Sequence, residues 1–279
     1  MGERFLEPWL TYIVFVVDYM KIEDVKKIGV LGAGVMGSGI AQVFATFGFD
    51  VIARDVNDTA LKGAMNEIVE GKYGLKRGVS RGKITQEQMD EAIKKIEMTT
   101  EMDEFCRDVD IVTECVPEDL NLKMKVFAEL DKKCPKHAIL ATNSSGFSVT
   151  ALARATERPD KVIGTHWFNP PPVLKGVEVI RAPDTSNETV EVVKGVLEKC
   201  GKMAIVFKDA PMAYGYLANR CYFALAREAM RIVEEGTATE TDVDNALKFG
   251  FGFPLGPFEL SGFLTGRGGE PKRRRRFEA

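Results

Sequence analysis

Residues 28 to 37 read IGVLGAGVMG, a short apolar run that leads into three closely spaced glycines. This pattern predicts a buried strand, a tight turn and the start of a helix. The first glycine allows the turn, the second leaves room for a ligand, and the third lets helix and strand pack closely. The helix would point unpaired N–H groups and its positive dipole end into the turn, which favours a dinucleotide pyrophosphate. The candidate contacts are Gly32, Gly34, Val35, Met36 and Gly37.

The flanking sequence favours this prediction over a glycine turn that is merely structural. A second apolar run over residues 50–55 ends in Asp55, which follows Gly32 by 55 − 32 = 23 residues. A carboxylate at that distance accepts hydrogen bonds from a ribose diol and repels a 2′-phosphate, so NAD is favoured over NADP. Arg54 weakens this preference, because a guanidinium beside the ribose could bind the phosphate.

Composition limits the classes of function. The chain has 279 residues, 45% of them hydrophobic and 28% charged, which suits one large or two medium globular domains. A formal net charge of −3 gives no reason to expect binding to nucleic acid or to a membrane. The five cysteines lack C-x-x-C spacing, so we expect free thiols, a reducing, cytoplasmic compartment and no metal site.

Strand and helix patterns alternate up to residue 210 and then become helical only. This order predicts an α/β fold of Rossmann type, with a doubly wound, mostly parallel sheet followed by a smaller, incomplete all-helical domain. Expected strands are 26–31, 50–55, 110–116, 138–142, 162–168, 177–180 and 204–207; expected helices are 38–47, 58–71, 85–96, 120–134, 148–155, 188–200, 217–234 and 241–249. The predicted divisions are an extension outside the core (1–24), a nucleotide-binding domain (25–210), a partial helical domain (211–262) and a basic tail (263–279).

The two ends of the chain carry separate predictions. The apolar run over residues 9–17 has acidic flanks and is too short for a membrane span, so we expect residues 1–19 to come from an upstream start codon or to add an edge strand. The tail contains Lys272 and four consecutive arginines, a run that is usually solvated.

Polar residues follow two of the expected strands, at the sheet edge where ligands bind in such folds. Asn143 opens NSSG, and His166 lies in THWFNP. The other histidine, His137, lies in a polar turn and is expected to be solvated. The residues alone leave open whether His166 is catalytic or a core histidine that the backbone satisfies.

Several motifs together resemble a known family. GAGVMG, NSS, HWFNPP, GVEVI, ANR and GPFEL occur in the order and spacing of the L-3-hydroxyacyl-CoA dehydrogenases, which include the 3-hydroxybutyryl-CoA enzymes, over about residues 25–262. The resemblance implies an NAD-binding Rossmann domain and a helical domain that forms a homodimer. It also implies oxidation of the 3-hydroxyl of an acyl-CoA to a ketone, in fatty-acid β-oxidation or 3-hydroxybutyryl-CoA metabolism.

The resemblance implies four catalytic residues. His166 becomes the acid/base and Glu178, 178 − 166 = 12 residues later, its partner, while Ser145 and Asn219 hold the substrate. Hydride loss from an alcohol requires removal of the hydroxyl proton, which suits an imidazole held by a carboxylate. From pattern alone, Glu178 could equally be an exposed strand residue, Ser145 a helix cap and Asn219 a polar helix residue.

The resemblance also implies cofactor contacts at Glu118 and Asn143. Glu118 could instead be an acid that the dipole favours in the first turn of a helix. The basic residues Lys72, Lys76 and Arg77 could meet the phosphates of CoA or form a solvated loop.

Two departures from the family pattern motivate alternatives. The segment Pro211-Met-Ala-Tyr-Gly-Tyr216 is longer than the family's Pro-Gly-Phe, and the match ends after Leu260, so we expect a truncated helical domain and an impaired dimer. An inactive dinucleotide-binding remnant, or a dehydrogenase for another small hydroxy acid, remains the alternative.

Overall fold

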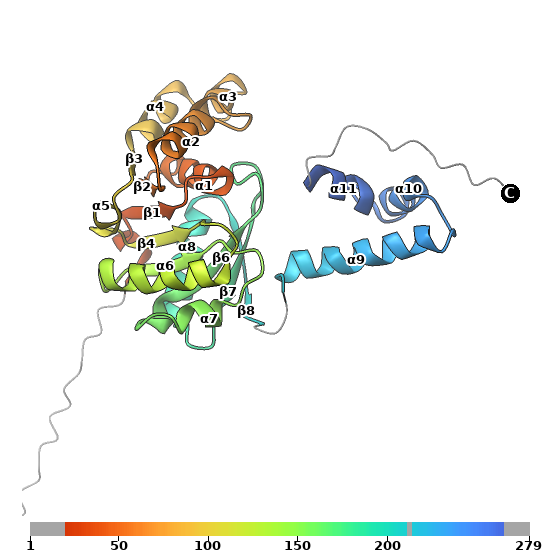
Figure 1. Ribbon diagram of the computed structural model, residues 1–279. Helices are drawn as coiled ribbons and strands as arrows, with labels where there is room; N and C mark the ends of the chain where they lie inside the picture. Colours follow the sequence, from red (N-terminus) through yellow and green to blue (C-terminus); the bar gives the residue numbers. More distant parts are fainter. Residues whose placement is uncertain (1–19, 211–213, 265–279) are drawn as a thin grey trace, which may run out of the picture.

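The computed structural model describes residues 20–210 and 214–264 (Figure 1). The predictions for residues 1–19 and for the basic tail from residue 265 lie outside these ranges. The described chain forms one eight-stranded sheet in the order β3-β2-β1-β4-β5-β6-β7-β8. The strands are β1 (Lys27–Leu31), β2 (Asp50–Arg54), β3 (Ile96–Thr99), β4 (Ile111–Glu114), β5 (Ile139–Thr142), β6 (Val162–Trp167), β7 (Gly176–Arg181) and β8 (Met203–Lys208).

All neighbouring strands are parallel except β6 and β7, which pair antiparallel. The strand order reverses between β1 and β4, so the chain leaves the sheet in opposite directions from these neighbours. Ligands bind at such a switch point, outside the carboxyl ends of the strands. The predicted Rossmann-type, mostly parallel sheet is therefore confirmed.

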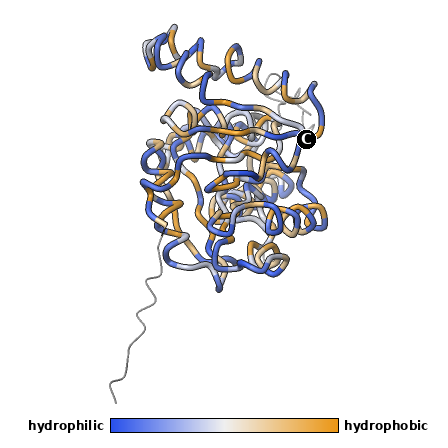
Figure 2. Tube along the Cα trace, turned by 90° about the vertical axis from the view of Figure 1, so that its left-hand side faces the viewer, coloured by the Kyte–Doolittle hydropathy of each residue, from blue (hydrophilic) through white to orange (hydrophobic). Residues whose placement is uncertain are grey.

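Both faces of the sheet are covered because the strands carry apolar residues on both sides. Val30, Ile111 and Ile163 belong to one buried cluster, whereas Leu31 and Val112 belong to another on the opposite face. The first cluster includes residues of α1 (Val35–Thr46) and α8 (Asn187–Lys199), and the second those of α5 (Met102–Cys106), α6 (Leu120–Lys133) and α7 (Val149–Ala153). In Figure 2 the colour alternates between blue and orange along the surface helices, as expected when each helix buries one side.

The remaining helices lie at two places in the molecule. Packed beside α1 are α2 (Asp58–Glu70) and α4 (Gln86–Lys94), with α3 (Leu75–Ser80) between them in the chain. After β8 the chain continues into α9 (Leu217–Glu234), α10 (Glu240–Phe251) and α11 (Pro257–Leu264), which contact one another; Figure 1 shows α9 leading away from the sheet, with α10 and α11 above it. None of the helices in the described ranges is long and apolar enough to cross a membrane.

The structure differs from the sequence-based expectation in four elements. Ile96 starts strand β3 instead of ending a helix. This strand has four residues and pairs only with β2, so its sequence shows little of the apolar pattern that predicts a strand. The stretch 72–83 contains helix α3, and helices α5 and α11 were also not predicted. The other predicted elements are present, with ends that differ by a few residues at most.

Candidate active site

The glycine turn connects β1 to α1 and leaves space for a ligand. Gly32 has φ +99°, and a Cβ there would lie 2.6 Å from the Cys115 carbonyl oxygen. A Cβ on Gly37 would lie 1.8 Å from the Gly32 carbonyl oxygen, so helix and turn touch at this point. A Cβ on Gly34 would meet no atom within 4 Å. The turn therefore needs its outer glycines for packing, while Gly34 keeps the mouth of the turn open.

Asp55 lies directly after β2 and beside this turn. One carboxylate oxygen accepts a hydrogen bond from the Ala33 amide at 2.7 Å, and the other accepts one from the Val56 amide at 2.7 Å. The neighbouring Arg54 donates its Nε to the Thr100 carbonyl at 3.1 Å. Asp55 thus bonds to the glycine turn, while Arg54 bonds to the segment after β3.

His166 and Glu178 face each other across the antiparallel pair β6–β7. They are direct partners in the strand register, which explains their 12-residue separation in the sequence. His166 Nδ1 lies 2.6 Å from Glu178 Oε2, and the two residues are only 5% and 1% exposed. The structure brings this predicted pair together, and the other ring nitrogen, Nε2, makes no hydrogen bond to the described residues.

The second oxygen of Glu178 contacts the helical part of the chain. Glu178 Oε1 accepts a hydrogen bond from the Ala218 amide, one of the first N–H groups of α9, at 2.8 Å. The positive end of a helix dipole favours a carboxylate at this point. The sequence pattern gave no signal for this contact, since it joins segments 40 residues apart.

The serine loop, which we define as residues 143–148, follows β5 and lies next to these groups. Asn143 Oδ1 accepts a hydrogen bond from the Trp167 amide at 2.9 Å, so the loop is tied to the strand that carries His166. Asn219 Nδ2 lies 3.4 Å from the Ser145 carbonyl oxygen. The N-cap of α7 is Ser148 and not Ser145. The alternative interpretation of Ser145 as a helix cap is therefore wrong.

Glu118 is bonded to the serine loop from the other side. Its Oε1 accepts hydrogen bonds from the Ser144 hydroxyl at 2.8 Å and from the Ser145 amide at 2.6 Å. Its Oε2 lies 3.0 Å from Lys123 Nζ. Asp119, rather than Glu118, is the N-cap of α6.

A buried ion pair below this loop was missed from the sequence. Glu114 is fully buried at the end of β4 and accepts hydrogen bonds from Lys123 Nζ at 2.8 Å and from the Thr142 hydroxyl at 2.7 Å. Burial raises the pKa of Glu114, an effect that the ammonium group opposes. Burial lowers the pKa of Lys123, but the carboxylates of Glu114 and Glu118 outweigh it and the net shift is upward. The two residues lie in the segment TECVPEDLNLK, residues 113–123, whose hydrophobic pattern does not indicate that they pair.

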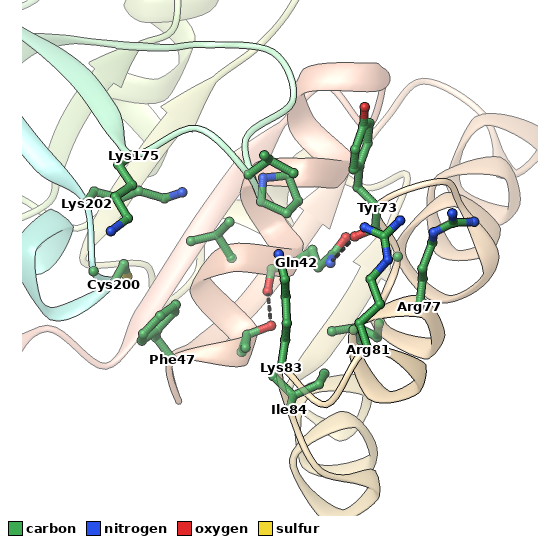
Figure 3. A pocket seen from close by; sticks show the side chains of 18 of the residues that line it. Gln42, Phe47, Tyr73, Arg77, Arg81, Lys83, Ile84, Lys175, Cys200 and Lys202 are labelled. Carbon is green, nitrogen blue, oxygen red and sulfur yellow. Dashed lines mark hydrogen bonds between the residues drawn. The ribbon is translucent and has the colours of Figure 1, made fainter.

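A basic pocket of about 370 Å³ opens between α1, the α3 region and the turn before β7 (Figure 3). Figure 3 shows Arg77 and Arg81 on one side of it and Lys175 and Lys202 on the other. Its basic lining residues are Lys72, Arg77, Arg81, Lys83, Lys175 and Lys202, and none of the described acidic residues lines it.

One lining residue, Lys202, and one residue expected to join the basic group, Lys76, lie in surroundings that the sequence did not predict. Lys202 is only 9% exposed and donates to the carbonyls of Pro171 at 2.6 Å and Leu174 at 2.8 Å; burial lowers its pKa. Lys76, expected beside Arg77, instead pairs with Glu70 and does not line the pocket.

Two smaller expectations have mixed outcomes. His137 is half exposed as expected, but it also lies 3.0 Å from an Asp110 oxygen. All five cysteines fall within the described ranges and are free thiols. Over the same ranges, no three His, Cys, Asp or Glu side chains gather in a way that could hold a metal ion.

The fold and these groups define a nucleotide-binding α/β protein with a buried histidine–carboxylate pair near the cofactor edge of its sheet. Comparisons with known proteins then narrow the class. Residues 27–210 match the family model for the NAD-binding domain of 3-hydroxyacyl-CoA dehydrogenase, and residues 215–274 match that for its C-terminal domain. The chain therefore belongs to the 3-hydroxyacyl-CoA dehydrogenase family, and its nucleotide cofactor is NAD.

Individual relatives agree with this assignment. A probable 3-hydroxybutyryl-CoA dehydrogenase of Bacillus subtilis (strain 168) is 39% identical over 241 residues, which cover 86% of this chain and 82% of the relative. The human mitochondrial hydroxyacyl-coenzyme A dehydrogenase is 37% identical over 242 residues, or 86% of this chain and 76% of that protein. The crystal structure of a Ralstonia eutropha (S)-3-hydroxybutyryl-CoA dehydrogenase superposes with a TM-score of 0.81 at 33% identity, covering 86% and 82% of the two chains.

Proposed function

We propose that this chain catalyses the NAD-dependent oxidation of an L-3-hydroxyacyl-CoA to the 3-oxoacyl-CoA, and the reverse reduction. The observation that carries the proposal is the buried His166–Glu178 contact at 2.6 Å, next to the serine loop. An alcohol loses a proton as it loses hydride, so the reaction needs a base within hydrogen-bonding reach of the hydroxyl.

In the proposed mechanism His166 Nε2 takes the hydroxyl proton of the substrate. Glu178 accepts from Nδ1, which fixes the tautomer with a lone pair on Nε2 and stabilises the imidazolium that forms. Ser145 and Asn219 orient the substrate oxygen, a task that suits neutral groups because it adds no charge as the alcohol becomes a ketone. NAD, when bound, accepts the hydride.

The residues at the glycine turn suit NAD. The α1 N-terminus and the open Gly34 position would take the pyrophosphate, and Asp55 would accept the ribose hydroxyls. Among the described residues Arg54 donates only its Nε, to the Thr100 carbonyl, so the preference for NAD is argued from the Asp55 carboxylate and not from Arg54. Glu118 and Asn143 would border the nicotinamide end.

The basic pocket supports CoA as the carrier of the substrate. CoA bears three phosphates, and a pocket with six cations and no carboxylate would attract them. Lys72 and Arg77, but not Lys76, are retained as candidate contacts, and Arg81, Lys83 and Lys175 are added. Binding energy gained there would position the acyl chain for reaction.

Three further features belong to the proposal. We retain a domain for NAD over residues 25–210 and a domain for substrate and assembly that begins at residue 211; the family match extends the latter to residue 274, beyond the predicted end at 262. Homodimer formation through the helical part stays a proposal, because rings such as Phe249 and Phe251, which are 83% and 78% exposed, fit both a dimer surface and the exposed face of a truncated domain. A cytoplasmic location stays a prediction based on the free thiols, and some relatives are mitochondrial.

A steady-state assay with acetoacetyl-CoA and NADH tests the proposal. We expect turnover, and we expect His166→Ala to abolish it while NADH affinity stays nearly unchanged. A folded, NADH-binding preparation without turnover would identify the chain as an inactive remnant. Turnover of free 3-hydroxybutyrate as efficient as that of its CoA thioester would favour a different hydroxy-acid dehydrogenase.

A further inference from the structure

The start of α9 packs directly on the serine loop. A Cβ on Gly146 would lie 2.4 Å from the Gly215 amide nitrogen, so the two backbones touch where both residues are glycine. Gly215 has φ +87°, a conformation that favours glycine. Beside this contact, the rings of Phe147 and Tyr214 meet edge to face with centroids 5.9 Å apart.

Tyr216 lies at the centre of this contact and is the N-cap residue of α9. It is only 5% exposed, and its hydroxyl donates a hydrogen bond to the Phe147 carbonyl at 2.6 Å. Its ring meets the His166 imidazole at a centroid distance of 5.6 Å and an interplanar angle of 61°. Burial raises the pKa of Tyr216, so the phenol stays a neutral donor over the working pH range.

The residues that follow Tyr216 contact two of the proposed catalytic residues. The Ala218 amide donates to Glu178, and Asn219 Nδ2 lies 3.4 Å from the Ser145 carbonyl. The Tyr216 carbonyl accepts the first hydrogen bond of the helix, from the Arg220 amide at 2.9 Å. A shift of Tyr216 would therefore move the whole first turn of α9, including the N–H group that holds Glu178.

We propose that Tyr216 is a positioning residue for the reaction. Its hydroxyl fixes the first turn of α9 to the serine loop, and its ring limits the orientation of His166. Together these contacts keep the Ala218 amide on Glu178 and Asn219 beside Ser145. The inference rests on the proposed dehydrogenase function and adds to it a residue that acts through the catalytic pair.

The variant Tyr216→Phe removes the hydroxyl and keeps the ring. Because a misplacement of about 1 Å in a catalytic group can cost up to about 100-fold in rate, we expect kcat with acetoacetyl-CoA and NADH to fall about tenfold. We expect KM and the Kd of NADH to stay within about twofold, since the glycine turn and the basic pocket are untouched. With NADH deuterated at the transferred position, the isotope effect on kcat should increase, because hydride transfer becomes slower than product release.

Tyr222→Phe is the matched control. Tyr222 lies on the same helix, and its hydroxyl also donates to a backbone carbonyl, that of Pro257 at 3.2 Å, but within the described part of the chain it makes no hydrogen bond or ring contact with His166 or Glu178. This variant should keep kcat and the isotope effect within about twofold of the wild type. Circular dichroism verifies the fold of both variants.

Distinct outcomes separate the two proposals. Absence of turnover by the wild type would contradict the dehydrogenase function itself. Two results would overturn the role of Tyr216 but not the dehydrogenase function, provided that the wild type turns over normally. The first is an unchanged kcat and isotope effect in Tyr216→Phe. The second is an equal loss of kcat in Tyr216→Phe and Tyr222→Phe. Hydrogen exchange of backbone amides in the wild type tests the proposal without any variant. The Ala218 amide should exchange as slowly as the amides of β6. Exchange as fast as that at the C-terminal end of α9 would contradict the proposal.

Discussion

Replacing Glu178 by Gln tests the catalytic pair because Glu178 accepts two hydrogen bonds, one on each oxygen. Its partners, His166 Nδ1 at 2.6 Å and the Ala218 amide at 2.8 Å, both donate. An amide side chain has one oxygen and an NH₂ group, so Glu178→Gln must face one of these donors with another donor. Either the Ala218 contact is lost or the imidazole changes tautomer and presents N–H, instead of a lone pair, to the substrate.

The size of the effect follows from the charge that is removed. Two unit charges about 4 Å apart interact by about 4 kcal/mol at an effective dielectric constant of about 20. The imidazolium forms only as the substrate loses its proton, so this stabilisation belongs to the transition state and not to the bound substrate. Allowing for residual stabilisation by the amide, we expect a loss of about 3 kcal/mol, or about a hundredfold in kcat.

The assay follows NADH formation from NAD and 3-hydroxybutyryl-CoA, the direction in which His166 starts neutral, with NADH affinity measured separately by fluorescence. Glu178→Gln should lower kcat and leave the Kd of NADH within about threefold, because the glycine turn lies on other strands. Glu191→Gln is the control, since its side chain is 72% exposed on α8. A kcat for Glu178→Gln within about fivefold of the wild type, with the fold intact, would refute the role of the carboxylate.

Three other substitutions test cofactor choice and stability. Asp55→Asn should raise the Kd of NADH about tenfold, because a charged acceptor for the ribose is lost; unchanged fluorescence titrations would exclude this contact. Thr165→Val should raise the free energy of unfolding by about 1 kcal/mol, since the buried Thr165 hydroxyl has no hydrogen-bond partner among the described residues; a lower Tm would contradict this. Arg158→Met should cost about 3–5 kcal/mol in urea denaturation, because it leaves the buried Asp131 carboxylate, 2.7 Å from Arg158 Nε, without its partner.

The Arg158 variant also predicts a change in pH dependence. Burial would raise the pKa of Asp131, but the Glu157 amide and Arg158 outweigh it and hold that pKa below the ordinary value of 3.8. This carboxylate therefore stabilises the fold above that pH, and its contribution is lost as pH falls through the folded-state pKa. Acid titration of the wild type should show a loss of stability below about pH 4 that Arg158→Met shows to a smaller degree; equal acid sensitivity would argue against the ion pair.

The fold could be predicted from the sequence wherever the signal is local. The strand and glycine pattern of residues 28–37 and the apolar runs of β4, β5 and β6 are set by neighbours along the chain, and these elements form as expected. Strand β3 could not be predicted in the same way, because four residues at a sheet edge carry little apolar periodicity and are stabilised by β2. The antiparallel direction of β7 likewise depends on how the turn between Phe168 and Lys175 folds, which periodicity does not encode.

The same distinction between local sequence and tertiary packing applies to the candidate site. The spacing of Asp55 and the proximity of His166 and Glu178 were predictable, the first from the motif and the second from the family resemblance. The contacts that hold these groups in place were not: the Lys123–Glu114 pair and the bonds made by Tyr216 and Ala218 join segments that only tertiary packing brings together. Because Glu178 is shared between His166 on the sheet and the first turn of α9, the charge of the proposed catalytic pair and the docking of α9 are coupled. A change in the seating of α9 therefore alters the histidine's partner even when every strand of the sheet is unchanged.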